Sequence, residues 1–314
     1  MLSFSFPGAK PFRLSAALSR SCLPVFCLML SLLLPCLATA AEAPVPKKFQ
    51  VGSITVTALQ DRANEMDISL FSGPASPEDR QKLMPGGKAP ASVNAFLIQA
   101  EGKKNILADT GFGSVLPTAS QLERCLSDLG LTPADIDIVL LTHMHADHVA
   151  GLLKDKQRAF PKAKIMVSKP ELDYWTGLAA KDPANTNAAL VKAVAEVYGK
   201  DLLPPFALGE ALLPGVSSVD ASGHTPGHSA FLVESGGGSL LIIGDLLHAA
   251  ALQFPLPDEC ARYDMDPPAA VKARKAILAM AAEKGIPVAG MHIPFSGMGR
   301  VRLEGKGFAF TPLP

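Results

Sequence analysis

The hydrophobic positions in the N-terminal half follow the period of β-strands. FQVGSITVTAL (49–59) alternates apolar and polar residues, many of them β-branched, and predicts strands. SVNAFLIQA (92–100) and NILADTG (105–111) lie on either side of a short polar turn and predict a hairpin. The segment 71–90 is rich in Pro and Gly and predicts a long loop.

Further along the chain, short apolar runs alternate with helical periodicity. Segment 116–130 places Leu122, Leu126 and Leu129 on one face and predicts a helix that ends near Gly130. Buried strands are predicted at 135–143, 164–168, 231–235, 239–245 and 286–292, and helices from Pro170, over 184–199 and over 268–284. Because these elements interleave while hairpins are also present, the pattern predicts an α/β (α+β) fold of mixed sheets covered by helices.

The first 40 residues have a different pattern. Three basic residues precede an apolar run, 23–37, which is followed by Ala38-Thr39-Ala40. This order is typical of a secretory signal peptide removed after Ala40, which would leave 41–314 as one exported domain, periplasmic or secreted. A retained membrane anchor is the alternative, although the run is short for a membrane span and contains two prolines.

Composition and charge limit the classes of binding partner that the chain can have. The chain is 48% hydrophobic and 18% charged, as in globular proteins. Residues 41–314 carry 26 basic and 29 acidic residues, a net charge of −3, which argues against nucleic-acid binding. Cys125 and Cys260 lie outside the signal segment, and they could form a disulfide or remain two thiols.

Three of the seven histidines lie in one turn after a predicted buried strand, LTHMHADHVAG (141–151). A buried imidazole needs hydrogen-bond partners, so three within six residues are costly unless one positive group satisfies them together. Neutral imidazole and carboxylate are ligands that zinc prefers, and Asp147 lies among these histidines. The turn therefore predicts a metal site, with a solvated polar turn as the alternative.

Three further strand ends carry residues of the same kind. His224 and His228 lie in the Pro/Gly turn VDASGHTPGHS (219–229), Asp245 follows the apolar run LLIIG, and His292 ends VAGMH. A carboxylate at the end of a buried strand is costly to leave unpaired. Because zinc takes about four ligands, these residues could complete a site that one turn cannot.

These segments resemble a known family. THMHADH is similar to the HxHxDH signature of the metallo-β-lactamase superfamily, and HTPGHS, IIGD and His292 resemble its other ligand-bearing segments in the same order. LADTG (107–111), GHTPGHS (223–229) and EGKGFAF (304–310) most resemble exported members of the methyl parathion hydrolase type. The resemblance covers roughly residues 50–310 and implies a four-layer αββα sandwich of two mixed β-sheets flanked by helices.

The resemblance also implies a dinuclear metal centre with seven ligands. His143, His145 and His228 would hold one metal, Asp147, His148 and His292 the other, and Asp245 would bridge them. The implied cofactor is two Zn²⁺ ions, with Mn, Fe or Co as alternatives, and Asp147 and Asp245 are the predicted catalytic residues. Asp109, Thr142 and His224 are predicted to support the ligands, and Trp175 and Phe112 to line a substrate pocket.

The implied reaction is hydrolysis of a small-molecule ester, lactone or phosphotriester. Two metals sharing one water lower its pKa toward about 7 and provide a hydroxide nucleophile. Asp245 argues against a β-lactamase, because lactamases of the superfamily usually have Cys or no ligand there. Segment 183–194 lacks the aromatics of organophosphate hydrolases, and Trp175 is equally well a core residue.

Several alternatives stay open at this point. They are β-lactamase activity, glyoxalase II-like thioesterase activity, and a non-catalytic exported metal-binding protein. No nucleic acid and, after signal removal, no membrane is expected as a partner. Many relatives are dimers, so a homodimer is also considered, although no pattern in this chain indicates one.

Removing the metal should abolish activity if these residues form a catalytic centre. Treatment with a chelator should stop turnover, and added zinc should restore it, because both the nucleophile and its activation depend on the metals. Hydrolysis rates before chelation, after it and after zinc addition measure this directly. Turnover that is unaffected by the chelator would contradict the prediction.

Overall fold

The computed structural model describes residues 44–99, 104–115 and 120–314. These residues belong to one compact unit of the chain. The predicted signal peptide, 1–40, lies outside them, as do residues 116–119 of the predicted helix. Within the described ranges, every helix is too short or too polar to cross a membrane.

Six strands form the first sheet, in the order β1-β2-β4-β5-β6-β9. They are β1 (Lys47–Val51), β2 (Ile54–Asp67), β4 (Lys88–Gln99), β5 (Asn105–Ala108), β6 (Ile138–Leu140) and β9 (Lys164–Met166). Pairing is antiparallel from β1 to β5 and parallel from β5 to β9, so the sheet is mixed. The predicted strands at 49–59 and the predicted hairpin of 92–111 are both present.

Seven strands form the second sheet, in the order β10-β11-β12-β13-β15-β16-β17. They are β10 (Ala211–Leu213), β11 (Val216–Asp220), β12 (Ser229–Ser235), β13 (Gly238–Ile242), β15 (Val288–Ala289), β16 (Met298–Glu304) and β17 (Gly307–Pro312). Only β13 and β15 pair in parallel. Two small antiparallel pairs lie outside the sheets: β3 (Phe71–Ser72) with β14 (Cys260–Ala261), and β7 (Leu153–Lys154) with β8 (Gln157–Arg158).

The helices in the described ranges connect these strands. They are α1 (Pro77–Leu83), α2 (Leu122–Asp128), α3 (Ala146–Val149), α4 (Lys169–Lys181), α5 (Thr186–Tyr198), α6 (Ala250–Gln253) and α7 (Pro267–Lys284). Asp266 caps the first turn of α7 by accepting from the Ala269 N–H, and Gly285 ends this helix with the positive φ that glycine tolerates. The predicted helix over 268–284 is thus confirmed.

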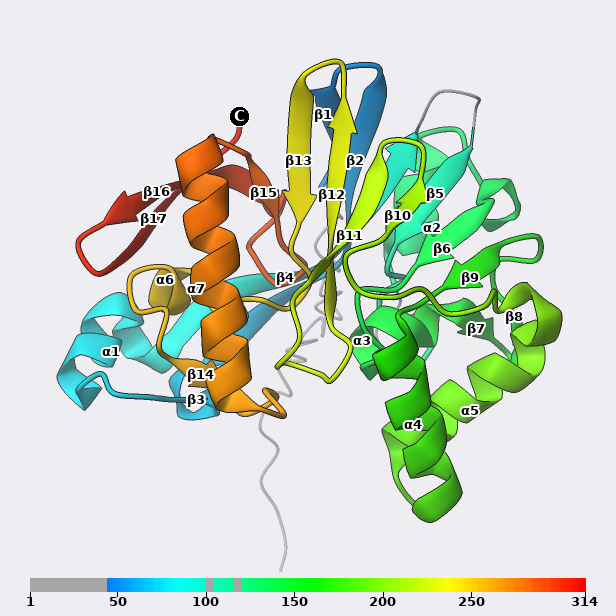
Figure 1. Cartoon of the computed structure of the whole chain (residues 1–314), viewed down its shortest axis with the longest axis horizontal. Helices are drawn as coiled ribbons and strands as arrows, with labels where there is room; N and C mark the ends of the chain where they lie inside the picture. The colour runs from blue at the N-terminus through cyan, green and yellow to red at the C-terminus, as the bar shows by residue number, and fades with distance from the viewer. Residues whose placement is uncertain (1–43, 100–103, 116–119) are drawn as a thin grey trace, which may run out of the picture. The chain divides into compact units, whose positions relative to one another are not determined.

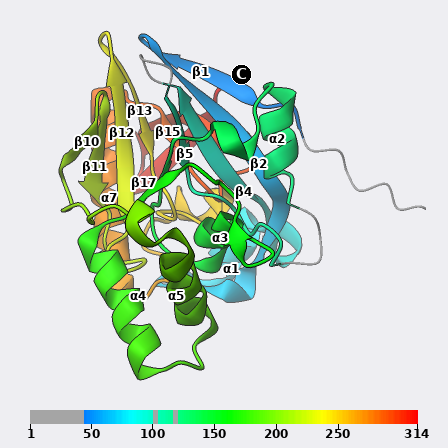
Figure 2. The same cartoon turned by 90° about the vertical axis from the view of Figure 1, so that its right-hand side faces the viewer.

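Because side chains alternate between the two faces of each strand, apolar residues form three layers between the sheets and the helices. In β4, Phe96 and Ile98 face the second sheet, while Ala95 and Leu97 face the opposite way, toward the layer that contains α2 and α5. The outer face of the second sheet packs against α7 through residues such as Leu278. Figures 1 and 2 show α7 over the second sheet and the two sheets face to face. The result is the expected αββα sandwich.

The segment 71–90 differs from the prediction of a long loop. It contains α1, which begins with Pro77 at its first position. Ser76 caps this helix, because its hydroxyl accepts a hydrogen bond from the Asp79 N–H. The prediction was wrong because a seven-residue helix is too short to show a helical period. Only the Ser-Pro start signal was available from the sequence.

The two cysteines of the described residues are separate buried thiols. Cys125 lies in α2 and packs in the layer between this helix and the first sheet, whereas Cys260 lies in β14. Burial raises the pKa of both thiols, which lowers their reactivity. Of the two alternatives left open by the sequence, the structure has the free thiols.

Phe96 tests the importance of the layer between the sheets. Its side chain is fully buried there, so Phe96→Ala should lower the free energy of unfolding by about 3–5 kcal/mol. Leu303 is 65% exposed, so Leu303→Ala is the control and should change it by less than about 0.5 kcal/mol. Denaturant unfolding measures both. Equal losses in the two variants would contradict this assignment of the core.

Candidate metal centre

Six of the seven predicted ligands, together with His224, converge at one edge of the sandwich, where strands of both sheets end. The turn after β6 brings His143, His145, Asp147 and His148, the last two within α3. The turn after β11, the end of β13 and the end of β15 bring His224, Asp245 and His292. Three close, overlapping groups result in the described part of the chain: three histidines, two carboxylates with two histidines, and His224 and Asp245 with His248.

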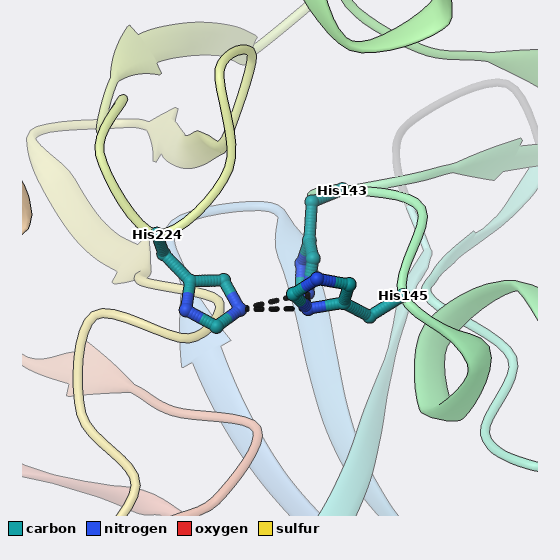
Figure 3. A group of neighbouring side chains, drawn as sticks. All are labelled: His143, His145 and His224. Atoms are coloured by element: carbon teal, nitrogen blue, oxygen red, sulfur yellow. Dashed lines mark hydrogen bonds between the residues drawn. The ribbon is translucent and has the colours of Figure 1, made fainter. Parts of the chain in front are cut away.

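The first group, the histidine site, consists of His143, His145 and His224. The Nε2 atom of His143 lies 3.1 Å from Nδ1 of His145 and 3.2 Å from Nε2 of His224. The His145 and His224 atoms are 2.9 Å apart. Figure 3 shows these three rings pointing their nitrogens at one another from two separate loops.

Hydrogen bonds behind the rings fix which nitrogens carry lone pairs. The Thr142 hydroxyl donates to Asp109 at 2.7 Å, so its oxygen accepts from Nδ1–H of His143 at 3.1 Å. Nδ1–H of His224 donates to Asp264 at 2.9 Å. The Nε2 atoms of His143 and His224 are therefore both lone pairs, 3.2 Å apart. Two lone pairs repel at this distance, and a cation between them would remove the repulsion.

The same arrangement recurs in the second group, the carboxylate site, which consists of Asp147, His148 and His292. Nδ1–H of His148 donates to Asp109 at 2.7 Å, and Nδ1–H of His292 donates to the Ser92 carbonyl at 2.9 Å. Nε2 of each ring therefore faces inward, and it carries a lone pair when the ring is neutral.

Carboxylate oxygens meet these inward lone pairs. An oxygen of Asp147 lies 3.3 Å from Nε2 of His292 and 3.6 Å from that of His148. His148 Nε2 and Asp245 Oδ1 are buried without a hydrogen-bond partner. Such a set of donors fits a divalent cation, because it satisfies lone pairs and negative charge together.

Asp245 lies between the two sites. Its carboxylate oxygens are 3.0–3.7 Å from ring nitrogens of both, so it could contribute a ligand atom to each. The five nearby imidazole nitrogens belong to His292 (3.0 Å), His148 (3.2 Å), His248 (3.2 Å), His224 (3.5 Å) and His143 (3.7 Å).

The electrostatics of the two sites differ. Burial lowers the pKa of His145 to about 4 and that of His224 to about 3, so these rings are neutral near pH 7. Burial also lowers the pKa of His292, but the charges of Asp245 and Asp147 outweigh it and raise the value to about 10. The histidine site thus presents neutral rings, whereas the two carboxylates of the other group favour a positive charge beside them.

The roles predicted for His224 and His228 are exchanged. Nδ1–H of His228 donates to the Ala221 carbonyl, and its Nε2 accepts from the Asp245 N–H, both at 3.0 Å. Both ring nitrogens are therefore occupied, and the prediction of His228 as a ligand was wrong. His228 directly precedes β12 and is held in the sheet, whereas His224 lies in the turn and reaches the site.

Asp109 and Thr142 lie behind rings of both sites. Asp109 has a positive φ of 60° and accepts from the N–H and hydroxyl of Thr142 and from His148. One buried carboxylate therefore orients a ring of each site, directly for His148 and through Thr142 for His143. Behind His224, Asp264 plays the same part and is paired with the buried Arg274 at 3.3 Å.

Trp175 does not line the substrate cavity, contrary to the prediction. Its indole packs in the layer under the first sheet, and its N–H donates to Glu171 at 2.6 Å. Glu171 itself is fully buried and accepts from donors in both histidine turns. The contacts of Glu171 with the two turns have no signal in the sequence, because these donors lie 27–56 residues away and α4 has an ordinary amphipathic pattern.

A cavity of about 380 Å³ opens onto Asp147, Asp245 and His292. Phe112 lines it as predicted, and its N–H donates to the buried Asp61 at 3.1 Å. The other lining residues in the described part of the chain are Asn64, Glu65, Met66, Leu70, His145, Ala146, Asn187, His248 and Tyr263. His248, outside all the sequence motifs, stacks on His292 with ring centroids 5.1 Å apart.

Comparison with known proteins agrees with this geometry. The family model of the metallo-beta-lactamase superfamily matches residues 89–292, well over half of the chain. The chain belongs to the metallo-beta-lactamase superfamily. The matched range begins in β4 and ends at His292, so it contains every residue of the two sites.

Among members of this superfamily, several lactonases resemble the chain. An N-acyl homoserine lactonase of Bacillus thuringiensis is 26% identical over 220 residues, which cover 62% of this chain and 78% of that protein. One from Bacillus sp. is 27% identical over 179 residues, 49% of this chain and 62% of its own length. The chain thus spans less than two thirds of that relative.

Solved structures are also similar over most of the chain. AidC, described as a dizinc quorum-quenching lactonase in complex with a homoserine product, has a TM-score of 0.77, 25% identity, and coverage of 86% of this chain and 98% of AidC. AbOPH, described as a hydrolase in the beta lactamase superfamily, has a TM-score of 0.78, 30% identity, and coverage of 87% and 99%.

Replacing each turn histidine separately tests the exchange of roles. If each site holds one zinc ion, His224→Ala should reduce bound zinc from two ions to one per chain, because it removes a nitrogen of the histidine site. His228→Ala should bind more zinc than His224→Ala and lose about 1–3 kcal/mol of stability through its two broken hydrogen bonds. Metal analysis and thermal unfolding distinguish them. Greater zinc loss in His228→Ala would restore the original assignment.

Proposed function

We propose that this protein is a dinuclear metal-dependent hydrolase that opens lactones, or cleaves related esters, of small molecules. The observation that carries the proposal is the convergence of inward-facing lone pairs and two carboxylates on the wall of a cavity. Such a centre favours the binding of cations and is accessible to a substrate, as a catalytic site must be. The lactonase relatives support the choice of reaction.

In this proposal the chain holds two divalent ions, zinc first among the candidates. The residues fit this role because rings of both sites turn a nitrogen inward and Asp245 reaches both sites. When bound, the ions supply Lewis-acid polarisation of the carbonyl and an activated water. The protein fixes the ring orientations from behind through Asp109, Thr142 and Asp264.

The cavity favours a substrate with a polar head and an apolar tail. Its volume of about 380 Å³ lies in the range of small-molecule sites. Met66, Leu70 and Phe112 offer apolar wall, while the side-chain amides of Asn64 and Asn187 can hydrogen-bond a carbonyl or amide. An acyl-substituted lactone combines these features.

The phosphotriesterase alternative has less support. An aromatic cluster was expected to hold the leaving group, yet Trp175 packs in the core. Among the described lining residues, the carbocyclic aromatics are Phe112 and the partly exposed Tyr263. A lactone needs no aromatic leaving-group site, so these walls suit it better.

We also propose that the protein acts outside the cytoplasm. The proposal is supported by the basic residues, apolar run and Ala-Thr-Ala sequence of the first 40 residues. Homodimer formation stays a prediction from the resemblance.

A substrate panel tests the proposed reaction. The zinc-loaded protein should hydrolyse N-acyl lactones with the highest kcat/KM, above p-nitrophenyl esters, a phosphotriester, S-lactoylglutathione and nitrocefin. His145→Ala should reduce lactone turnover at least about tenfold, because it removes a ligand nitrogen of the histidine site. Lactone opening is followed by acid release in a pH-indicator assay.

The same panel identifies the competing functions. Preference for the phosphotriester, the thioester or nitrocefin would replace the lactonase proposal with that activity. Two bound metals without turnover of any class would support the non-catalytic binding protein.

A further inference from the structure

Glu171 is a fully buried carboxylate in the first turn of α4 that accepts four hydrogen bonds. Oε1 accepts from the Met144 N–H at 2.9 Å and from the Trp175 indole N–H at 2.6 Å. Oε2 accepts from the Thr225 hydroxyl at 2.7 Å and from the Gly227 N–H at 3.0 Å. All four partners are donors, so the site suits an ionised carboxylate.

The donors come from both loops that build the histidine site. Met144 lies between His143 and His145, and Thr225 directly follows His224. These loops leave different sheets, after β6 and after β11. A single side chain therefore links the two turns whose imidazoles must converge.

The link requires close packing of the second turn on α4. A side-chain carbon at Gly227 would lie 2.2 Å from the backbone nitrogen of Glu171, so only glycine permits this approach. The Ser168 hydroxyl also donates to the Gly227 carbonyl at 2.6 Å. On the other turn, the Asn187 side chain donates to the Met144 carbonyl at 2.8 Å.

Trp175 connects this link to the orientation of one ligand ring. Its indole lies edge-on to the His145 ring, with centroids 5.6 Å apart and an angle of 70°. The hydrogen bond to Glu171 holds the indole in this place. The indole therefore supports the His145 orientation in which Nδ1 faces His143 and His224.

We infer that Glu171 is the positioning residue of the histidine site and controls its metal affinity selectively. Its carboxylate sets the spacing of the two turns and, through Trp175, the angle of His145. The carboxylate site is held by other groups, Asp109 and the Ser92 carbonyl, so it should not depend on Glu171. This inference rests on the proposed function in one respect, that the histidine site binds a metal.

The test is zinc binding by Glu171→Gln in the full chain. The glutamine keeps the size of the side chain but turns an NH₂ group toward two of the four donors. We expect the zinc affinity of the histidine site to fall about 10- to 100-fold, while the other site keeps its affinity. Competition titration against a chromogenic chelator measures both constants, and the visible spectrum of the cobalt-loaded protein reports the geometry of the altered site.

Glu259→Gln is the matched control. Glu259 is also fully buried and bonded to several donors, among them Arg80 and the Ala75 N–H, but neither donor lies in a histidine turn. It should lose stability with unchanged zinc constants. Trp175→Phe, which keeps an aromatic ring but removes the indole N–H, should weaken the histidine site less than Glu171→Gln.

The outcomes separate the inference from the function on which it rests. Wild-type protein that binds no zinc at the histidine site would overturn the proposed function. Wild-type protein with two zinc ions, together with Glu171→Gln of unchanged zinc constants and spectrum, would overturn the inference alone. If Glu171→Gln does not fold, Trp175→Phe and Thr225→Val carry the test, and unchanged zinc constants in both would overturn the inference.

Discussion

The structure depends on the hydrogen bonds that orient five buried imidazoles. His143, His148, His224 and His292 each use Nδ1–H on a partner behind the ring, so that Nε2 points inward and is a lone pair when the ring is neutral. His228 has no such free nitrogen, because both of its nitrogens bond the backbone. The hydrogen bonds behind the rings therefore decide which histidines can serve a cation, and proximity alone does not.

This centre also couples the two sheets. The turn after β6 belongs to the first sheet, whereas Asp245 and His292 follow strands of the second. A cation bound between them would add to the apolar contacts that join the sheets, so metal binding and folding should be linked. The layer between the sheets, with Phe96 and Phe231, is mainly apolar and offsets the cost of this polar edge.

The sequence was most informative at the strand ends that carry histidine or aspartate residues. The position of the centre was predicted by the histidines of 143–148, which follow one apolar run, and by Asp245, which follows another. The alternation in 92–100 predicted a strand of the first sheet. The exchange of His224 and His228 could not be predicted, because ring direction within a Pro/Gly turn depends on partners such as Asp264, 40 residues away. Short elements such as α1 were missed because they hold too few residues for a period.

The same argument explains why Trp175 was assigned to the wrong environment. A large aromatic near a metal turn can face the cavity or the core, and the sequence pattern is identical for both. The buried Glu171 keeps the indole on the core side, because its carboxylate accepts a hydrogen bond from the indole N–H there at 2.6 Å. On the cavity side, Asp61 similarly holds the backbone of Phe112. Buried carboxylates thus place both aromatic residues, just as Asp109 and Asp264 orient the histidines.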